Sequence, residues 1–287
     1  MTQVYLPQTL PELWSYLDAE PEALIFAGGT DLLVKMRAGT VASLPGLICL
    51  ERLAELRDVR ETAAGIRIGA AVTSTEILRH PLLLSCLPVL IRALQTLGSP
   101  LIRNMGTIGG NICTASPAGD TLPPLYILQA EVELRTRDNV RILPIREFIS
   151  GPGATKLQKG EILTGIVVKK PDEYNIHHFE KVGQRKSMAC AVASMAALLR
   201  LSPSGVIEAA RFAWGSVGPT VITSATVEDT LIGEKLSLTT LTAAAYKIRQ
   251  IVKPIDDARA SANYRRTVSG NLLLRLFNNV WPQFPSS

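Results

Sequence analysis

The sequence predicts an α+β fold built as two domains, and three observations lead to this prediction. Four segments repeat apolar residues at the spacing of a helix. Residues 132–142 alternate apolar and charged side chains about a turn at Asp138-Asn139, as a β-hairpin does. A polar link that contains a proline, at 170–173, then separates two halves of different pattern. The four helical segments are residues 10–17, 88–97, 238–252 and 261–277.

The first half is expected to combine helices, short strands and glycine turns. Thr9 and Glu12 have the spacing of a capping box, with a proline between them, so a helix is expected to begin there. A short buried strand at 23–26 runs into the double glycine of residues 27–31, and residues 32–37 are expected to be helical. The further elements expected in this half are strands at residues 47–50, 66–71 and 162–168 and a short helix at residues 74–78.

The second half is expected to hold two strands followed by the two long helices. The strand-like stretches are residues 189–199 and 209–217. The predicted domains are residues 1–171, with two subdomains that meet near residue 56 (about 1–56 and 57–171), and residues 172–287.

The composition suits a water-soluble protein with a sizeable core. Of 287 residues, 47% are hydrophobic and 19% charged, and the net charge of +5 is dispersed along the chain. Aromatic residues make up only 5%, so the basic stripe with stacking aromatics that is typical of nucleic-acid binding is not expected. The most apolar run, residues 82–94, is broken by Pro88 and Arg92 and is too short to span a membrane. Because no signal-peptide pattern is seen, a cytoplasmic location without membrane insertion is expected.

Cysteine and histidine are too few and too scattered to predict a metal site. The four cysteines include no CxxC pair, and two of the three histidines are adjacent to each other. Neither a serine–histidine–acid set nor a pair of facing carboxylates is apparent, so no side chain is assigned a catalytic role.

Two glycine segments carry the strongest functional signal. AGGTDL, residues 27–32, places a double glycine between a strand and a helix, where free backbone N–H groups favour an anion such as phosphate. The alternative is an ordinary tight turn in which Thr30 or Asp31 caps the helix. TIGGN, residues 107–111, is a second double glycine, and Asp120 follows nine residues later as an acceptor for ribose hydroxyls.

Together the two segments favour a dinucleotide, since each can lie against one side of a pyrophosphate. The GxGxxG fingerprint and the GxxxxGK[ST] phosphate loop are both absent, which argues against a Rossmann NAD site and against ATP or GTP.

Four motifs, in this order and spacing, carry a resemblance to a known family. They are AGGTDL, IRNMGTIGGNICTASPAGD, KVGQRKSMACAVAS and DDARASANYRR. The chain resembles the FAD-binding (medium) subunits of the molybdenum hydroxylases, the family of xanthine dehydrogenase and carbon monoxide dehydrogenase. The resemblance implies an FAD-binding domain of the vanillyl-alcohol-oxidase (PCMH) type, followed by a smaller α+β C-terminal domain.

The resemblance also implies a set of FAD contacts. The first glycine segment would bind the pyrophosphate, extending to Leu33 and Val34, and Asp120 would hold the ribose side. Leu163 would make an apolar contact to the flavin, and Lys181 would lie near the isoalloxazine ring, the alternative for Lys181 being a solvated surface lysine. The full predicted set is Ala27, Gly28, Gly29, Thr30, Asp31, Leu32, Leu33, Thr107, Gly109, Gly110, Asn111, Asp120, Leu163 and Lys181.

Two further motifs of the resemblance receive a prediction. Arg185 and Lys186 lie in a loop that borders the flavin in relatives, and their role is open. The block at residues 256–265 is expected to be structural, with Ser261 capping the last helix. In the same block, Arg259 and Arg265 are expected to pair with Asp256 or Asp257.

The resemblance implies an electron-transfer subunit that holds FAD non-covalently, with Cys113 as the residue to test for a covalent bond. A large partner subunit would carry the molybdenum cofactor and a small one the [2Fe–2S] clusters, in a dimer of heterotrimers. The flavin would pass electrons to NAD, a quinone, oxygen or another acceptor. Two alternatives stay open, namely a stand-alone flavin reductase or oxidase of the same superfold and a flavin-free assembly subunit.

Overall fold

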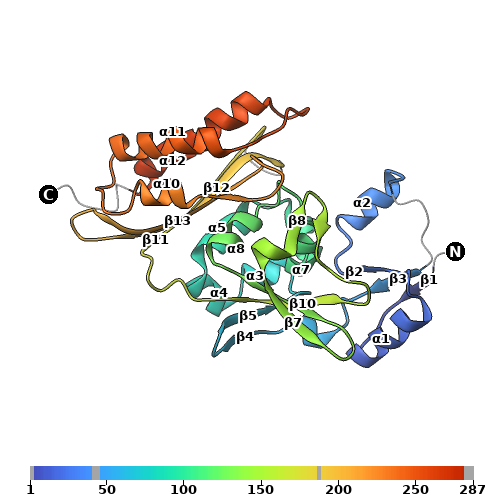
Figure 1. Ribbon diagram of the computed structural model, residues 1–287. Coiled ribbons are helices and arrows are strands. Elements are labelled where there is room, and N and C mark those ends of the chain that lie inside the picture. Colours follow the sequence, from blue (N-terminus) through green and yellow to red (C-terminus); the bar gives the residue numbers. More distant parts are fainter. Residues whose placement is uncertain (1–2, 41–45, 186–188, 281–287) are drawn as a thin grey trace. The chain divides into compact units, whose positions relative to one another are not determined.

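The chain folds into two compact units, each assembled from three separate stretches of sequence. The computed structural model describes residues 3–40, 46–185 and 189–280 (Figure 1). The first unit comprises Met1–His80, Ser99–Ala115 and Gln129–Lys169, and the second comprises Pro81–Gly98, Ser116–Leu128 and Lys170–Ser287. These units follow contacts and not continuous sequence, so the domain boundary expected near residue 171 stays a prediction.

The first unit begins with a small parallel sheet and one amphipathic helix. Helix α1, Leu10–Ala19, starts where expected, and the Thr9 side chain accepts the backbone N–H of Glu12. The predicted capping box is only half formed, because the Glu12 carboxylate accepts from Gln8 N–H at 2.7 Å and not from Thr9. Leu13 of this helix is fully buried in the core of the small sheet.

The parallel sheet has the order β1-β3-β2. Strands β1 (Gln3–Tyr5) and β2 (Leu24–Phe26) each pair with the central strand β3, Gly46–Cys49. Strand β1 was not expected from the sequence, since three residues are too few to show a pattern. Strand β2 was expected to be buried, but its residues are half-buried, because it lies at an edge of the sheet. Helix α2, Leu32–Arg37, follows β2 after the first glycine segment.

A five-stranded antiparallel sheet forms the larger part of the first unit. Its order is β4-β5-β10-β6-β7, so the late strand β10 lies between two strands that precede it in sequence. The predicted hairpin is confirmed as β6 and β7. The bounds are Val59–Thr62 for β4, Gly65–Gly69 for β5, Glu131–Arg135 for β6, Val140–Pro144 for β7 and Ile162–Val168 for β10.

Short elements complete the first unit. They are η1 (Ala54–Leu56), α3 (Ser74–Ile77), α6 (Pro100–Met105), α7 (Ile108–Thr114), α9 (Ile145–Phe148), and the small hairpin of β8 (Ile149–Gly151) and β9 (Ala154–Thr155).

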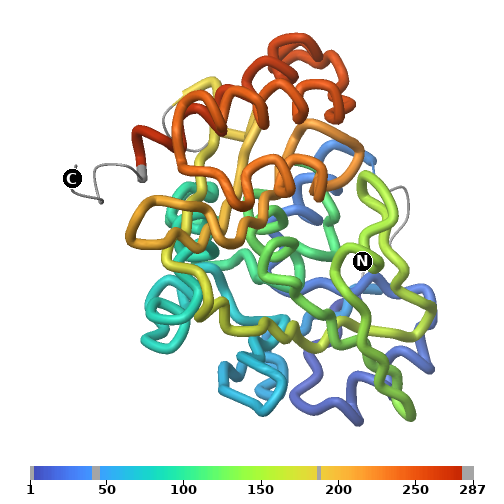
Figure 2. Tube along the Cα trace, turned by 60° about the vertical axis from the view of Figure 1, so that its left-hand side comes forward, coloured from blue at the N-terminus to red at the C-terminus, as the bar shows by residue number. Residues whose placement is uncertain are grey.

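The second unit is a four-stranded antiparallel sheet with helices packed on it, in the order β11-β12-β13-β14. The long helices α11 and α12 lie side by side against the sheet (Figures 1 and 2), and α5 and α8 also contact its strands. Strand β12 is buried at nearly every position, as expected for a strand covered on both faces. The strands are β11 (Ile176–Gly183), β12 (Ala191–Leu201), β13 (Ile207–Gly215) and β14 (Ile222–Thr223). The helices are α4 (Pro81–Cys86), α5 (Pro88–Thr96), α8 (Leu122–Ile127), α10 (Ala225–Asp229), α11 (Leu238–Ile251) and α12 (Ala262–Val280).

The block that precedes α12 is structural, as predicted. Ser261 accepts the N–H of Tyr264, and Asp257 pairs with Arg259 at 3.1 Å and Arg265 at 2.6 Å. Hydrogen bonds from backbone N–H groups, beginning with that of Arg259, and from Arg265 lower the pKa of Asp257 to about 2. Arg265 is buried and also donates to the carbonyls of Val192 and Ser216, which ties the block to the sheet.

No helix within the described residues is long and apolar enough to cross a membrane.

Candidate functional site

The two glycine segments meet within the first unit, although they are far apart in sequence. A Cβ on Gly28 would lie 1.7 Å from the backbone oxygen of Met105, just before the second segment. A Cβ on Gly106 would lie 3.5 Å from the Thr30 hydroxyl oxygen, so the Thr30 side chain also lies near the residues that lead into the second segment. Asp31 accepts a hydrogen bond from the Thr114 hydroxyl at 3.2 Å. The contacts require glycine at position 28 because another backbone occupies the place of a side chain.

The first segment presents a row of unused backbone donors. In the part of the chain that the structure describes, the N–H groups of residues 28–31 donate to no acceptor. Gly29 has a φ of +67°, in the left-handed region where glycine is favoured, and this conformation turns the chain between β2 and α2. Consecutive free N–H groups at such a turn form a concave site for an anion. The geometry therefore supports the predicted phosphate contact for this segment.

The alternative interpretation, in which Asp31 of the first segment caps α2 through its side chain, is not supported by the hydrogen bonds. Asp31 occupies the position before α2, but its carboxylate makes no capping hydrogen bond. It pairs instead with Lys35 at 2.7 Å and accepts from Thr114. The bond from Thr114 holds the turn against α7, whereas the pair with Lys35 stays within the turn and α2.

The second segment is a helix and not a loop. Thr107 caps α7 by accepting the N–H of Gly110 at 3.1 Å. The N–H of Ile108 donates to Val72 and that of Gly109 to Ala70, at 3.0 and 2.9 Å. These amides are therefore unavailable to a phosphate.

The glycines of the second segment differ in what surrounds them. A Cβ on Gly109 would lie 2.6 Å from that of Ala70, so this glycine allows α7 to approach the end of β5 closely. Gly110 is exposed, and the nearest atom to a Cβ there would be the Thr107 hydroxyl oxygen at 3.0 Å. Gly110 is thus the point of this segment that a ligand can approach.

In the second unit, Asp120 and Lys181 form a buried ion pair. Their side chains are each 8% exposed, and Nζ of Lys181 lies 2.6 Å from Oδ2 of Asp120. Nζ also donates to the carbonyl of Thr96 at 2.8 Å. The alternative of a solvated surface lysine at position 181 does not hold, because the ammonium is enclosed and bonded. The sequence does not reveal this pair or the role of Thr96, since three distant segments contribute to it.

The other oxygen of Asp120, Oδ1, is buried and has no hydrogen-bond partner within the described residues. An unsatisfied buried acceptor costs about 1–3 kcal/mol, and more when it is charged. Burial raises the pKa of Asp120 to about 6, although the charge and hydrogen bond of Lys181 act in the opposite direction. Oδ1 is therefore available to accept a hydrogen bond from a ligand, and the contact of Asp120 with a ribose hydroxyl stays a prediction.

The remaining predicted residues lie in varied surroundings. Leu163 is buried in β10, whereas Leu33 and Val34 of α2 are exposed, at 51% and 63%. Arg185 is exposed, and Lys186 lies outside the described residues. Burial raises the pKa of the Cys113 thiol to about 12, so the thiol is protonated near neutral pH.

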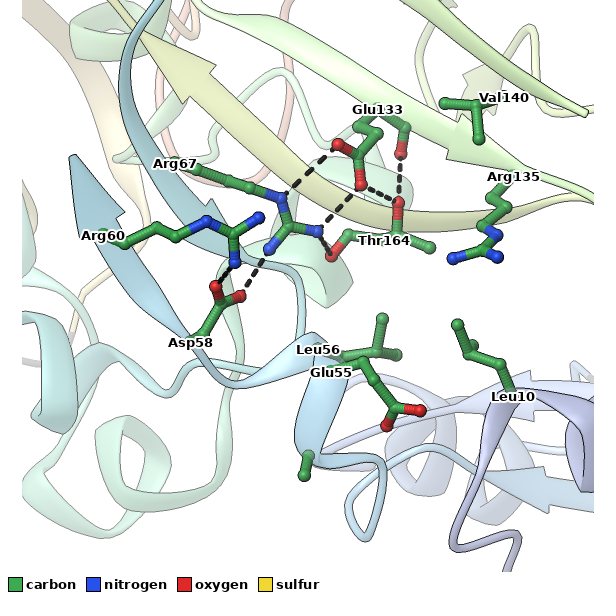
Figure 3. A pocket seen from close by; sticks show the side chains of 11 residues that line it. Leu10, Glu55, Leu56, Asp58, Arg60, Arg67, Glu133, Arg135, Val140 and Thr164 are labelled. Carbon is green, nitrogen blue, oxygen red and sulfur yellow. Dashed lines mark hydrogen bonds and ion pairs between the residues drawn. The ribbon is translucent and has the colours of Figure 1, made fainter. Parts of the chain in front are cut away.

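A hollow of about 540 Å³ opens in the first unit, apart from the glycine segments (Figure 3). None of its lining residues belongs to the predicted FAD set. One wall is closed by the buried Arg67, which donates to Asp58, to Glu133 at 2.8 Å and to the Thr164 carbonyl at 3.3 Å. Burial acts to raise the pKa of Glu133, but hydrogen bonds from Arg67 and Thr164 outweigh it and lower that pKa. The network links β5, β6 and β10, so its role is structural.

We predict that Gly28→Ala disrupts the first glycine segment. The added Cβ has no room beside the Met105 carbonyl, so the turn must shift, at a cost typical of overpacking of about 1–3 kcal/mol or more. The thermal midpoint and the flavin content per chain should both fall. Gly151→Ala is the matched control, because that position, like Gly28, has no left-handed φ, and the nearest atom to the added Cβ is the Cβ of Ala154, at an ordinary 3.9 Å. Flavin content that falls equally in both variants would contradict the steric explanation.

We predict that Arg67→Met destabilises the first unit by about 3 kcal/mol, because two carboxylates lose their buried partner. Arg60→Met is the control, since Arg60 pairs with the same Asp58 but is 59% exposed and should cost below about 1 kcal/mol. Urea unfolding at neutral pH measures both variants. The difference should shrink as the pH falls through the lowered pKa of Glu133, where the wild-type carboxylate also becomes neutral. Equal unfolding midpoints for the two variants at neutral pH would exclude this role.

Groups of three or more metal-ligating side chains are absent from the described parts of the chain.

Residues 1–171 match the family described as the FAD binding domain in molybdopterin dehydrogenase, and residues 178–280 match the CO dehydrogenase flavoprotein C-terminal domain. The nicotinate dehydrogenase FAD-subunit of Eubacterium barkeri is 31% identical over 288 residues, which cover 98% of this chain and 96% of that protein. The putative xanthine dehydrogenase FAD-binding subunit of Escherichia coli strain K12 is 33% identical over 259 residues, 90% of this chain and 88% of that protein.

Among solved structures, carbon monoxide dehydrogenase from Hydrogenophaga pseudoflava has a chain that superposes with a TM-score of 0.91 at 28% identity. The match covers 99% of this chain and 98% of that one. The predicted resemblance and fold class are confirmed, and the relatives are subunits of dehydrogenases, so the chain is part of an oxidoreductase. Its matches along both halves identify it as a member of the FAD-binding subunits of the molybdenum hydroxylases.

Proposed function

We propose that this chain carries FAD as the electron-transfer subunit of its complex, taking electrons from [2Fe–2S] clusters of a partner and passing them to NAD or another acceptor. The observation that carries the proposal is the set of unused polar groups. These are the backbone N–H groups of residues 28–31 in the first unit and Oδ1 of Asp120 in the second. Donors of this kind suit phosphate oxygens, and a buried carboxylate oxygen suits a hydroxyl.

The residues present fit FAD on chemical grounds. The free amides of the first segment bind the pyrophosphate, and the exposed Gly110 lets the cofactor approach the backbone closely. Asp120 accepts a hydroxyl, and the apolar Leu163 and Leu33 are suited to uncharged parts of the cofactor. Bound FAD supplies the electron chemistry, while the protein supplies its orientation and electrostatics. The proposed contacts are Ala27, Gly28, Gly29, Thr30, Asp31, Leu32, Leu33, Thr107, Gly109, Gly110, Asn111, Asp120 and Leu163, and Lys181 belongs to the site through its ion pair with Asp120.

We further propose that the attachment is non-covalent. A thiol reacts as its thiolate, and burial raises the pKa of Cys113, the cysteine next to the glycine segment, to about 12. A reactive thiolate at neutral pH is therefore disfavoured there.

The assembly follows by analogy with relatives named as medium chains of carbon monoxide dehydrogenases. We propose a large partner with the molybdenum cofactor, a small partner with [2Fe–2S] clusters, a dimer of such heterotrimers and a cytoplasmic location. The substrate of the molybdenum subunit is decided by that subunit and not by this chain.

We expect the purified protein to be yellow and to release its flavin on denaturation, because non-covalent contacts are lost on unfolding. Chromatography of the released chromophore should identify FAD. A folded, colourless protein that also fails to take up added FAD would contradict the proposed function, and colour that stays with the denatured chain would contradict non-covalent attachment. In that second case, Cys113→Ser is the variant to examine.

We also expect the chain to co-purify with its two partner subunits and to receive electrons only through the iron–sulfur subunit. Mixing it with the [2Fe–2S] subunit, reduced by dithionite and freed of excess reductant, should bleach the flavin absorbance. Adding NAD⁺ afterwards tests the acceptor, since reoxidation of the flavin identifies NAD. A chain that elutes alone on gel filtration, and whose flavin stays oxidised in the mixture, would instead behave as a stand-alone flavoprotein.

A further inference from the structure

The ion pair in the second unit leaves one oxygen of Asp120 committed and the other free. Lys181, on β11, donates to Oδ2 at 2.6 Å and to the carbonyl of Thr96, the last residue of α5, at 2.8 Å. Its ammonium is thus held from two directions, and the carboxylate cannot turn without losing its partner. Oδ1 is left as a buried acceptor without a hydrogen bond within the described residues.

We infer that Lys181 is a positioning residue, which aims Oδ1 of Asp120 at a hydroxyl group of the bound cofactor. The inference rests on the proposed binding of FAD and assigns Lys181 a role through Asp120, whereas the resemblance implied only a place near the isoalloxazine ring.

The charges of the pair indicate which class of chemical group donates a hydrogen bond to Oδ1. Lys181 already neutralises the carboxylate, so a second cation is not needed to stabilise it. A phosphate would place its negative charge beside a carboxylate and offer no proton to Oδ1. A neutral hydroxyl satisfies the free acceptor without adding charge. The cofactor offers such groups on its ribose and on its ribityl chain.

The same geometry explains why removing Lys181 would disable Asp120. Burial raises the pKa of Asp120, and Lys181 is the charged side chain that lowers it. Without the ammonium group, the effect of burial would therefore act alone and the pKa would rise further. The carboxyl group would then take up a proton at a higher pH and would be free to rotate. A protonated Oδ1 donates a hydrogen bond where the hydroxyl of the cofactor requires an acceptor.

A double-mutant cycle on FAD affinity, measured by flavin fluorescence on the full chain, tests the inference. Asp120→Asn and Lys181→Met should each weaken binding by about ten- to a hundredfold, the value of one hydrogen bond to a charged group. Because Lys181 acts through Asp120, the double variant should bind no more weakly than Asp120→Asn alone. Additive losses would show that Lys181 contacts the cofactor independently and would overturn the inference.

The pH dependence supplies a readout that a purely structural role would not change. The pKa of Asp120 is raised above its usual value, to about 6, and the cofactor requires the ionised form. Wild-type affinity should therefore be full at higher pH and fall as the pH drops through about 6. In Lys181→Met the midpoint should move to higher pH, and in Asp120→Asn this transition should disappear. An unchanged midpoint in Lys181→Met would contradict the inference.

Controls separate this inference from a failure to fold and from the proposed function. Lys247→Met removes an exposed lysine of α11 and should leave both affinity and midpoint unchanged. If Lys181→Met does not fold, Lys181→Gln removes the charge, and the same shift of the midpoint is expected. Wild-type protein that binds no FAD would overturn the proposed function, whereas wild-type binding with a normal midpoint in the Lys181 variants would overturn only the positioning role.

Two fragments of the cofactor identify the hydroxyl. ADP carries the ribose and FMN carries the ribityl chain. Asp120→Asn should weaken binding of ADP if the ribose is the donor and of FMN if the ribityl chain is. Undiminished binding of both fragments would mean that Oδ1 accepts from neither, which contradicts the inference.

Discussion

The close approach of Gly28 to the carbonyl of Met105 is the constraint on which the candidate site of the first unit depends. It brings a turn near the start of the chain against the segment that leads into α7, where Thr30 lies near Gly106, while Asp31 accepts a hydrogen bond from Thr114 at the end of α7. With the turn held in this way, the amides of residues 28–31 donate to no acceptor among the residues that the structure describes. A backbone contact that admits no side chain thus leaves a row of donors that a ligand can satisfy.

The two buried groups of charged side chains differ in how completely their hydrogen bonds are made, and this difference separates a structural role from a binding role. Arg67 donates through every nitrogen of its guanidinium group, and the acceptors tie adjacent strands together. The pair of Asp120 and Lys181 is equally buried but leaves one carboxylate oxygen without a partner among the described residues. Since an unpaired buried acceptor opposes folding, its presence is best explained by a group that binds there.

The glycine pattern indicated the correct cofactor, but most of these glycines have a different role from the phosphate contact that was expected of them. A double glycine was interpreted as room for phosphate, but Gly28 and Gly109 make room for the protein's own backbone at Met105 and Ala70. The second segment satisfies its amides internally as the start of α7. Glycine at these positions is therefore needed to assemble the site, and the donors that remain for a ligand are concentrated in the first segment.

The sequence by itself determined the fold class, about half of the elements, and the family to which the chain belongs, because periodicity, turn residues and short motifs are local signals. The hairpin of β6 and β7 and the cap at Thr9 follow from such signals. Only the tertiary structure decided that α5 and α8 pack with the C-terminal sheet, and that Asp120 pairs with Lys181. Burial of that pair, and hence its altered pKa and its free oxygen, arises from packing between segments distant in sequence, which no local pattern encodes.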